Sequence, residues 1–265
     1  MSVVTFLTDY GLSDDFVGVC HGVIARIAPQ ARVIDITHGV QRHDVRAGAV
    51  VLRRAIAYMP AGVHVAVVDP GVGGDRRAVA LCCADDGQIL VGPDNGLLTP
   101  AAQRLGGVAE ALDVGRSPLR LEPVSRTFHG RDIFAPVAAH LAAGTPFRDA
   151  GQPIDPATLV TLELPRPRLD GEAVVAHVLA ADAYGNVALD AERHDLAGSG
   201  LKLGSAVFVN GRRAVFATTF GVVREGELVL YEDGFGALSV AVNRGSALET
   251  LGLEADAEVE LAPAP

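Results

Sequence analysis

Aromatic side chains are scarce in this sequence, and tryptophan is missing altogether. The 265 residues include no Trp, four Tyr and nine Phe, so these three types make up 5% of the chain. A series of rings that stacks on successive bases is therefore not expected. Positive charge is also in short supply, because Lys and Arg number 22 against 32 Asp and Glu, giving a formal net charge of −10. This balance argues against a nucleic-acid partner held through its phosphates.

Cysteine is rare, and its spacing argues against two common uses. Of the three cysteines, Cys82 and Cys83 are adjacent and Cys20 lies far from both, so neither a CxxC pair nor a zinc spacing exists. An odd number of cysteines does not favour a disulfide framework. The sequence also lacks an apolar run of about 18 residues and a basic leader, so we expect no membrane span, no signal peptide and a cytoplasmic protein.

The short signatures of several enzyme classes are missing as well. The chain contains no P-loop, no GxSxG, no HExxH and no Rossmann GxGxxG motif. A functional prediction must therefore come from side chains that follow strands and open helices.

The most informative stretch runs from Val67 to Arg76. The segment before it, Val63–Val68, is rich in β-branched residues and nearly continuous in apolar character, which is typical of a strand buried on both faces of a parallel sheet. Asp69 ends this strand, and Pro70 with three following glycines predicts a loop that brings Arg76 back toward the carboxylate. Open α/β sheets bind ligands at the carboxyl ends of strands, although an Asp that accepts backbone hydrogen bonds in a turn is the alternative.

Strands alternate with helices in the first part of the chain. The expected elements are strand Val3–Thr8, helix Asp14–Ala28, strand Arg32–Ile36, helix Asp44–Tyr58, strands Val63–Val68, Ala78–Cys83 and Ile89–Val91, and helix Asp132–Ala143 with Asp132 as its N-cap. This alternation predicts βαβ units and a mostly parallel sheet flanked by helices.

The pattern changes near the proline-containing segment Leu164–Arg168. Beyond it the expected elements are short strands separated by turns, at Ala173–Ala180, Ala206–Val209, Ala214–Thr218, Glu227–Tyr231 and Leu238–Asn243. We therefore predict an α/β protein with two domains: an α/β domain over residues 1–165 and an all-β domain, an antiparallel barrel or sandwich, over residues 166–265.

Three acids of the first domain end strands or open loops, namely Asp9, Asp14 and Asp69. A carboxylate accepts two hydrogen bonds from a vicinal diol, so one of them is suited to hold a ribose. Asp14 alone is more simply explained as a charge at a helix N-terminus. His129 lies in a loop before the last helix, next to Gly130, which allows close approach of a ligand.

The other candidates are less distinctive. His21, His64, His140 and His177 are expected to be structural, and the roles of His38 and His43 stay open. In the second domain, Asp182–Asn186 lies between two strands, where a hairpin turn is the simpler interpretation. Phe220 is either a core aromatic residue or a stacking surface. The residues alone predict an acid-rich α/β site with an arginine and a histidine.

Five groups of residues, taken in order, carry a resemblance to a known family. They are Thr8–Gly11 with Asp14–Gly18, Asp69–Gly73, Gly92–Gly96, Thr127–Pro136 and Tyr184–Asn186. Over essentially its whole length the chain resembles the S-adenosyl-L-methionine hydroxide adenosyltransferases, which are relatives of the fluorinases and chlorinases. The resemblance implies hydrolysis of S-adenosyl-L-methionine to adenosine and L-methionine by a homotrimer, without a metal or another cofactor.

The resemblance also implies roles for single residues. Asp69, Arg76 and His129 match the catalytic set of the hydrolytic members, and Asp9 matches the residue that holds the ribose. By the same similarity, Asp14 and Asp182 would face the methionine ammonium, Asn186 would face adenine, and Phe220 would stack on it. Relatives often have polar residues for the methionine carboxylate where this chain has Gly234-Phe235-Gly236.

Two other functions remain to be compared with hydrolysis. A 5′-halogenase would carry an extra loop in the first domain, and the short spacing from Asp44 to Val63 leaves no room for it. A non-catalytic sensor of S-adenosyl-L-methionine or a nucleoside would need the binding residues alone. The sequence does not indicate which of Asp69, Arg76 and His129 acts on the water as the base.

Overall fold

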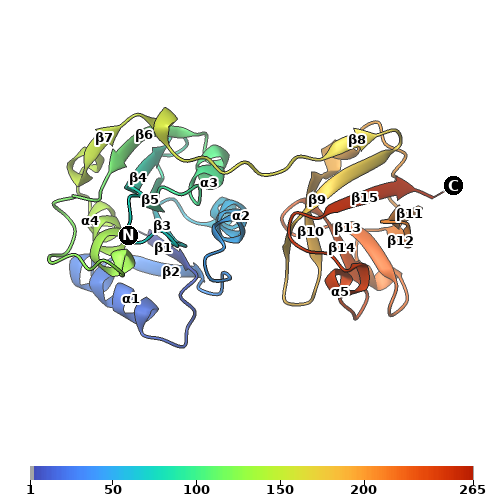
Figure 1. The fold of residues 1–265 in the computed structure, drawn as a ribbon, viewed down its shortest axis with the longest axis horizontal. Coiled ribbons are helices and arrows are strands. Elements are labelled where there is room, and N and C mark those ends of the chain that lie inside the picture. The colour runs from blue at the N-terminus through green and yellow to red at the C-terminus, as the bar shows by residue number, and fades with distance from the viewer. Residues whose placement is uncertain (1–2, 265) are drawn as a thin grey trace. The chain divides into compact units, whose positions relative to one another are not determined.

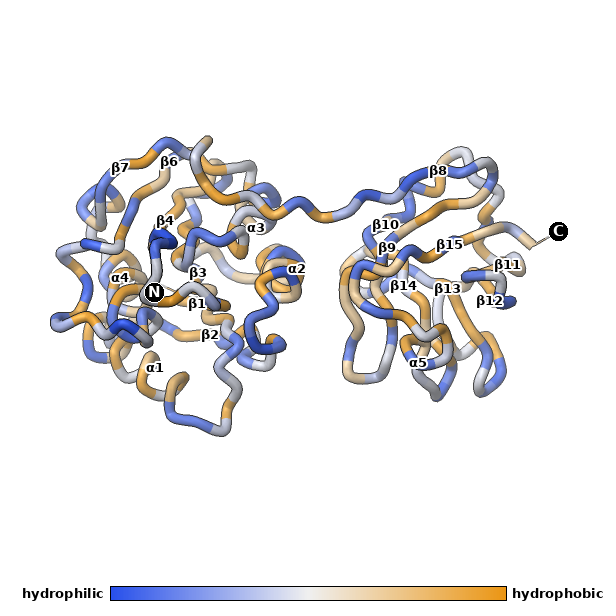
Figure 2. The backbone as a smooth tube through the Cα atoms, in the orientation of Figure 1, coloured by the Kyte–Doolittle hydropathy of each residue, from blue (hydrophilic) through white to orange (hydrophobic). Residues whose placement is uncertain are grey.

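The structure, a computed structural model, describes residues 3–264 and divides into two units between Leu162 and Glu163. Figure 1 shows the first unit in blue to yellow-green and the second in yellow to red. Figure 2 shows hydrophobic residues along the strands of each unit and hydrophilic residues in many of the loops. No helix within residues 3–264 combines the length and the apolar character that a membrane crossing requires.

The first unit is built on a mixed sheet that, within the described residues, has seven strands in the order β2-β1-β3-β5-β4-β6-β7. They are β1 (Val3–Thr8), β2 (Arg32–Thr37), β3 (Val63–Val67), β4 (Ala78–Cys83), β5 (Ile89–Pro93), β6 (Val108–Asp113) and β7 (Gln152–Ile154). The pairs among β2, β1, β3 and β5 are parallel, whereas β4, β6 and β7 extend the sheet with antiparallel pairs. The predicted α/β class is confirmed, and its parallel part is centred on β1 and β3.

Helices cover both faces of this sheet. They are α1 (Phe16–Ile27), α2 (Val45–Ala55), α3 (Thr99–Arg104) and α4 (Ala135–Ala142). Side chains alternate between the faces of a strand, so Phe6 of β1 belongs to the core under α1 and α4, while Leu7 belongs to the core under α2 and α3. The Asp44 carboxylate caps α2 by accepting a hydrogen bond from the Ala47 N–H at 2.8 Å.

The start of the last helix differs from the prediction. Asp132 was predicted as an N-cap, but the chain already forms a π-helical turn over Gly130–Phe134 that continues into α4. The Asp132 carboxylate is buried, and it accepts hydrogen bonds from the Ser125 N–H at 2.8 Å and from the Arg131 guanidinium. The N-cap prediction is therefore wrong, because this carboxylate fixes the preceding loop instead of a helix end.

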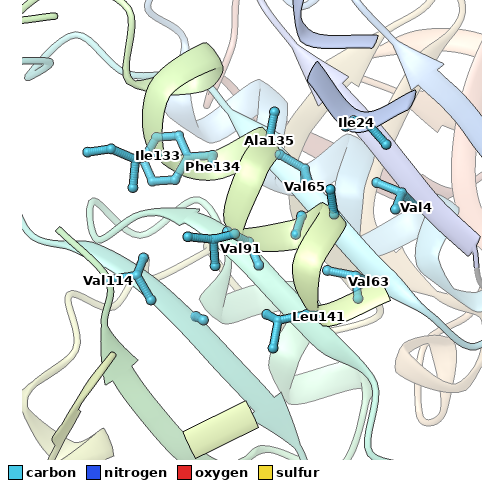
Figure 3. Packing of buried hydrophobic residues seen from close by; sticks show 14 of the residues in the cluster. Val4, Ile24, Val63, Val65, Val91, Val114, Ile133, Phe134, Ala135 and Leu141 are labelled. Carbon is cyan, nitrogen blue, oxygen red and sulfur yellow. The ribbon is translucent and has the colours of Figure 1, made fainter. Parts of the chain in front are cut away.

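Packing between β3 and α4 brings the main candidate residues onto one rigid frame. Val63 and Val65 of β3 lie against Ala135 and Leu141 of α4 in a core whose members are at most 7% exposed (Figure 3). Burial of each large apolar side chain contributes about 1.5–3 kcal/mol. Because β3 ends next to Asp69 and the turn before α4 begins after His129, this core sets the position of both residues.

The second unit is a closed barrel. Within the described part of the chain its strands follow the order β10-β14-β13-β12-β11-β15-β9-β8, and a pair between β9 and β10 closes the ring and leaves β8 outside it. They are β8 (Arg168–Asp170), β9 (Ala173–Ala181), β10 (Val187–Glu192), β11 (Ala206–Val209), β12 (Arg212–Phe216), β13 (Leu228–Glu232), β14 (Ala237–Val242) and β15 (Glu258–Pro263). The predicted barrel is confirmed, with the helix α5 (Ala247–Leu251) after β14.

One pair of this barrel does not follow the antiparallel pattern. β12 and β13 are parallel, with Val215 opposite Val229. A parallel pair needs a connection that returns to the start of the first strand. The segment between Phe216 and Leu228 makes this connection and carries Phe220.

Two glycines give a prediction about the fold. A Cβ at Gly92 in β5 would lie 2.3 Å from the Ala66 carbonyl oxygen of β3, so Gly92→Ala must displace a strand. We expect it to lower the free energy of unfolding by about 1–3 kcal/mol or more. A Cβ at Gly22 in α1 meets no atom within 4 Å, so Gly22→Ala should raise the free energy of unfolding by about 0.5–1 kcal/mol. Urea denaturation measures both values, and equal effects of the two substitutions would contradict the strand contact.

Candidate active site

The carboxyl ends of two neighbouring strands present acids side by side. β1 and β3 are parallel and in register, with Thr8 opposite Val67. Asp9 follows β1 directly, and Asp69 follows β3 after one intervening residue. Both carboxylates therefore lie at the same edge of the sheet. This is the edge where open α/β sheets bind ligands.

A cavity of about 350 Å³ opens at this edge. It is lined by four predicted site residues, Asp9, Asp14, Asp69 and His129, and by Tyr10, Phe16, Arg42, His43, Val67, Val72, Thr127, Phe128 and Gly130. The sequence prediction of an acid-rich pocket with a histidine agrees with this lining.

Arg76 joins two of these residues from behind the cavity. Its Nε donates to both oxygens of Asp69, at 2.9 and 3.0 Å, and its Nη2 also donates to the same carboxylate. The Nη2 lies 2.8 Å from Nδ1 of His129. The side chains of Asp69 and Arg76 are 6% and 11% exposed, and the guanidinium lies 5.4 Å from the ring centroid of Phe134. Asp69 and Arg76, both nearly buried, and the half-buried His129 therefore form one hydrogen-bonded array.

This array determines the protonation of His129. A guanidinium has no acceptor, so Nδ1 of His129 must accept the hydrogen bond, and the neutral imidazole carries its proton on Nε2. Burial lowers the pKa of His129 below its ordinary value of 6.5, and the Arg76 charge lowers it further, while Asp69 acts in the opposite direction. His129 is therefore neutral at pH 7.

The loop after β2 orients Asp9. Oδ2 of Asp9 accepts a hydrogen bond from the His43 N–H at 2.8 Å, and His43 adopts a left-handed backbone conformation with φ of 67°. The open question about His43 is answered in part, because this residue both lines the cavity and positions the carboxylate. His38 does not line the cavity and lies buried beneath the same loop.

Sequence reasoning missed the aromatic wall of this cavity. The rings of Tyr10, Phe16 and Phe128 contact one another at centroid distances of 5.0–5.9 Å. Phe16 is 40% exposed, which is more than expected for a core residue of an amphipathic helix. Burial raises the pKa of Tyr10 well above its ordinary value, so its hydroxyl stays protonated and keeps its donor. The spacing of apolar residues along the chain does not reveal this wall, because its rings come from three separate segments.

The second unit has a cavity of its own, with a volume of about 510 Å³. It is lined by the predicted residues Asn186 and Phe220 together with Tyr184, Val242, Arg244, Gly245 and Ser246. Phe220 is 45% exposed and packs edge-on against Tyr231, so it is not a core residue.

Asp182 lies beside this cavity and organises the loop between β9 and β10. Its Oδ1 accepts from the backbone N–H groups of Tyr184 and Asn186, at 2.9 and 3.0 Å, and its Oδ2 accepts from the Asn186 side chain at 2.8 Å. The hairpin turn considered from the sequence is therefore present, and it fixes the direction of the Asn186 amide.

The fold and the array define a class of protein: a two-domain enzyme with an α/β unit that carries a carboxylate, a guanidinium and an imidazole in contact. Residues 4–151 match the family model for the SAM hydroxide adenosyltransferase N-terminal domain, and residues 176–260 match the model for the C-terminal domain. The chain belongs to the SAM hydroxide adenosyltransferase family, as the resemblance predicted.

Individual proteins agree with this assignment. An (R)-S-adenosyl-L-methionine hydrolase of Salinispora tropica is 51% identical over 251 residues, which cover 94% of each chain. A fluorinase of Nocardia brasiliensis is 28% identical over 289 residues, which cover 98% of this chain and 96% of the fluorinase. The crystal structure of an uncharacterized conserved protein from Thermotoga maritima superposes with a TM-score of 0.91 at 38% identity and covers 98% of this chain and 99% of that one.

The contact between Arg76 and His129 predicts a measurable titration. His129 should titrate below 6.5, and Arg76→Met should raise this pKa, because the substitution removes a positive charge and leaves the Asp69 charge in place. Histidine NMR signals followed against pH measure both values. A His129 curve that does not move in Arg76→Met would contradict the contact.

Proposed function

We propose that this protein hydrolyses S-adenosyl-L-methionine to adenosine and L-methionine. The observation that carries the proposal is the array of Asp69, Arg76 and His129 at the wall of a cavity that also holds Asp9. The hydrolase of Salinispora tropica, at 51% identity, supports the same reaction.

The leaving group makes this chemistry possible without a metal or another cofactor. When the C5′–S bond breaks, its electron pair neutralises the sulfonium, so methionine departs as an uncharged thioether. The difficulty lies with the nucleophile, because neutral water attacks carbon poorly. The enzyme must hold the water in line with C5′, take one of its protons and stabilise the charge that develops on its oxygen.

The array divides these tasks among its members. The proton on Nε2 of His129 follows from the hydrogen bond that Arg76 donates to Nδ1. In this tautomer His129 holds the guanidinium in place and does not accept a proton at Nε2. Asp69 accepts the proton of the attacking water on Oδ1, since this oxygen accepts a single hydrogen bond from Arg76 and keeps a lone pair, whereas Oδ2 accepts two. Arg76 stabilises the charge on the attacking oxygen.

The remaining predicted residues bind the substrate. Asp9 accepts hydrogen bonds from the two ribose hydroxyls, and Asp14 faces the methionine ammonium. In the second unit, Phe220 stacks on adenine, Asn186 faces the edge of the base, and Asp182 adds negative charge for the ammonium. The exposure of Phe220 supports stacking, because an exposed ring is available to a ligand.

The two alternative functions predict different products. A halogenase would transfer chloride to C5′, and a sensor would bind S-adenosyl-L-methionine without converting it. The buried array argues against a sensor, since pairing a guanidinium with both a carboxylate and an imidazole is not needed to bind a nucleoside. The cytoplasmic location expected from the sequence stays a prediction.

The bond that is cleaved can be identified with labelled water. In ¹⁸O-water the label should enter the 5′-hydroxyl of adenosine, because water attacks C5′ in the proposed mechanism. Mass spectrometry of the products, with and without chloride, makes the measurement. Homoserine with methylthioadenosine, or unlabelled adenosine, would exclude this mechanism, and 5′-chloroadenosine would indicate the halogenase.

Substitutions at His129 separate a base from a positioning residue. Asparagine offers an acceptor oxygen near the position of Nδ1, so His129→Asn should stay within about tenfold of the native kcat, whereas His129→Ala should lose about 10²-fold through misplacement of Arg76. Asp69→Asn should lower kcat by about 10²–10⁴-fold. If His129 were the base, the Asn and Ala variants would be equally impaired. KM is the control and should change little in the His129 variants.

The same assignment predicts the pH dependence. Protonation of Nδ1 removes the acceptor for Arg76, so kcat should fall as pH drops through the lowered pKa of His129, with a midpoint below 6.5. His129→Asn should lack this acidic limb, since an amide does not titrate there. A pH–rate profile of both proteins measures the difference, and an identical limb in His129→Asn would assign it to another group.

The assembly we propose is a homotrimer in which a substrate is held by the first unit of one chain and the second unit of a neighbour. The separate cavities of the two units support a shared site. Asp69→Ala and Asp182→Ala should each be inactive, and subunits unfolded and reassembled together in equal amounts should regain roughly a quarter of the sites by random pairing around the ring. Mixed trimers without activity would exclude the shared site.

A further inference from the structure

A second group of chemically distinctive side chains lies outside the cavity. His21 of α1, Asp35 of β2 and His38, which follows β2, place one nitrogen or oxygen atom each within 4.8 Å of one another. Within residues 3–264 no other group of three or more His, Cys, Asp or Glu residues has its ligand atoms so close together. None of the three lines the cavity that holds Asp69 and His129.

The three atoms are close enough to bind one small divalent ion after small shifts, with the ion replacing the hydrogen bond between His21 and Asp35. Nε2 of His21 lies 2.8 Å from Oδ1 of Asp35, and Nε2 of His38 lies 3.2 Å from the same oxygen. Ligand atoms of a tetrahedral zinc ion with bonds of about 2.1 Å are separated by about 3.4 Å. Shifts of a few tenths of an ångström in His21 and Asp35, whose side chains are 36% and 40% exposed, would accommodate the ion.

An unsatisfied atom indicates that His38 is built for such a ligand. The His38 side chain is 3% exposed, and its buried Nε2 has no hydrogen-bond partner among the described residues. A buried polar atom without a partner is unfavourable, because it has lost its hydrogen bonds to water and gained none in the protein. When Nδ1 carries the proton, the lone pair of Nε2 faces the negatively charged Asp35 carboxylate, and the two repel each other. A cation between them would be coordinated by both and would remove this repulsion.

The other nitrogen of His38 is held as in metal sites. Nδ1 lies 2.8 Å from Oγ1 of Thr8, and both groups are buried. Metal-binding histidines almost always use their second ring nitrogen in such a hydrogen bond, which fixes the tautomer and the ring. The ring is also packed against Phe6, at a centroid distance of 5.0 Å.

The geometry points to a divalent transition-metal site, with zinc as the fitting ion, formed by His21, Asp35 and His38. Two imidazoles and one carboxylate suit zinc or iron(II), with the remaining positions taken by water. The ion takes no part in the proposed hydrolysis. Its role is to position the loop that carries Asp9.

The contacts of His38 connect the site to this loop. The His38 carbonyl accepts a hydrogen bond from the Gly11 N–H at 2.8 Å, and Oγ1 of Thr8 accepts one from the Tyr10 N–H at 3.1 Å. A bound ion would tie α1 and β2 to the segment that presents Asp9 and Tyr10. Removal of the ion should therefore loosen the edge of the cavity without removing any residue that lines it.

Cobalt binding tests the site directly. Protein without an affinity tag, treated with a chelator, should bind one equivalent of Co²⁺ with the visible absorption of a four-coordinate ion, and Zn²⁺ should displace it. His21→Gln and His38→Gln should each abolish the absorption. His177→Gln is the matched control, because Nδ1 of His177 pairs with Asp190 at 2.8 Å and its Nε2 lies 3.7 Å from Glu258. It should bind Co²⁺ as the native protein does.

Thermal unfolding gives a second readout. Zn²⁺ at about a hundred times its Kd should raise Tm by about 5–10 °C in the native protein and in His177→Gln. The Tm of His21→Gln, whose side chain lies near the surface, should not respond, and this variant keeps the test valid if His38→Gln does not fold. Absence of Co²⁺ absorption in the native protein, or equal binding by His21→Gln, would overturn the proposal.

Discussion

The ion pair between Asp69 and Arg76 is the interaction on which the first unit depends. Both side chains are nearly buried, and a buried charge is tolerated only when it is paired and hydrogen-bonded. The pair joins the two ends of the glycine-rich loop after β3. The same loop packs against the backbone of Arg126, because a Cβ at Gly73 would lie 2.2 Å from the Arg126 carbonyl oxygen. That contact brings the segment before His129 against the loop. Arg76, which neutralises the buried Asp69 carboxylate, also donates a hydrogen bond to the His129 imidazole and so holds it in place. Removal of either partner would leave an unpaired charge in the core of the site.

The sequence predicted the parts of this arrangement that are local in the chain. A strand followed by an acid and a glycine-rich loop was enough to predict that Arg76 returns to Asp69, and the hydrogen bonds between them confirm this contact. Long-range contacts were not accessible in this way. Aspartate is a common N-cap residue, so Asp132 was predicted to cap the helix. Its partner in the structure is the Ser125 N–H, which lies in a loop whose course depends on how the helix packs. The helix α3 and the strand β6 were not predicted, because their apolar runs are short. Pairing and packing with the rest of the sheet, and not a local pattern, determine where they form.

The aromatic wall and the buried histidine show the same limit. Tyr10, Phe16 and Phe128 stand within motifs that carry the family resemblance, but only the fold shows that their rings contact one another. The role of His38 was left open for a similar reason. A histidine after a strand does not indicate that one ring nitrogen will form a hydrogen bond with Thr8 while the other has no hydrogen-bond partner. Family resemblance assigned the residues that match its motifs, and it could not assign residues outside them.

The parallel pair in the barrel has a consequence for how this protein can change over generations. The segment that connects β12 to β13 carries Phe220 and contributes no strand to the barrel. Ala217 and Val223 of this segment pack against Val229 and Ala241, whereas its exposed part around Phe220 can vary while the register of the barrel stays the same. The array of Asp69, Arg76 and His129 belongs to a separately packed unit with its own core. If Phe220 stacks on the base as proposed, selection can alter which base is accepted through this exposed connection and leave the array unchanged.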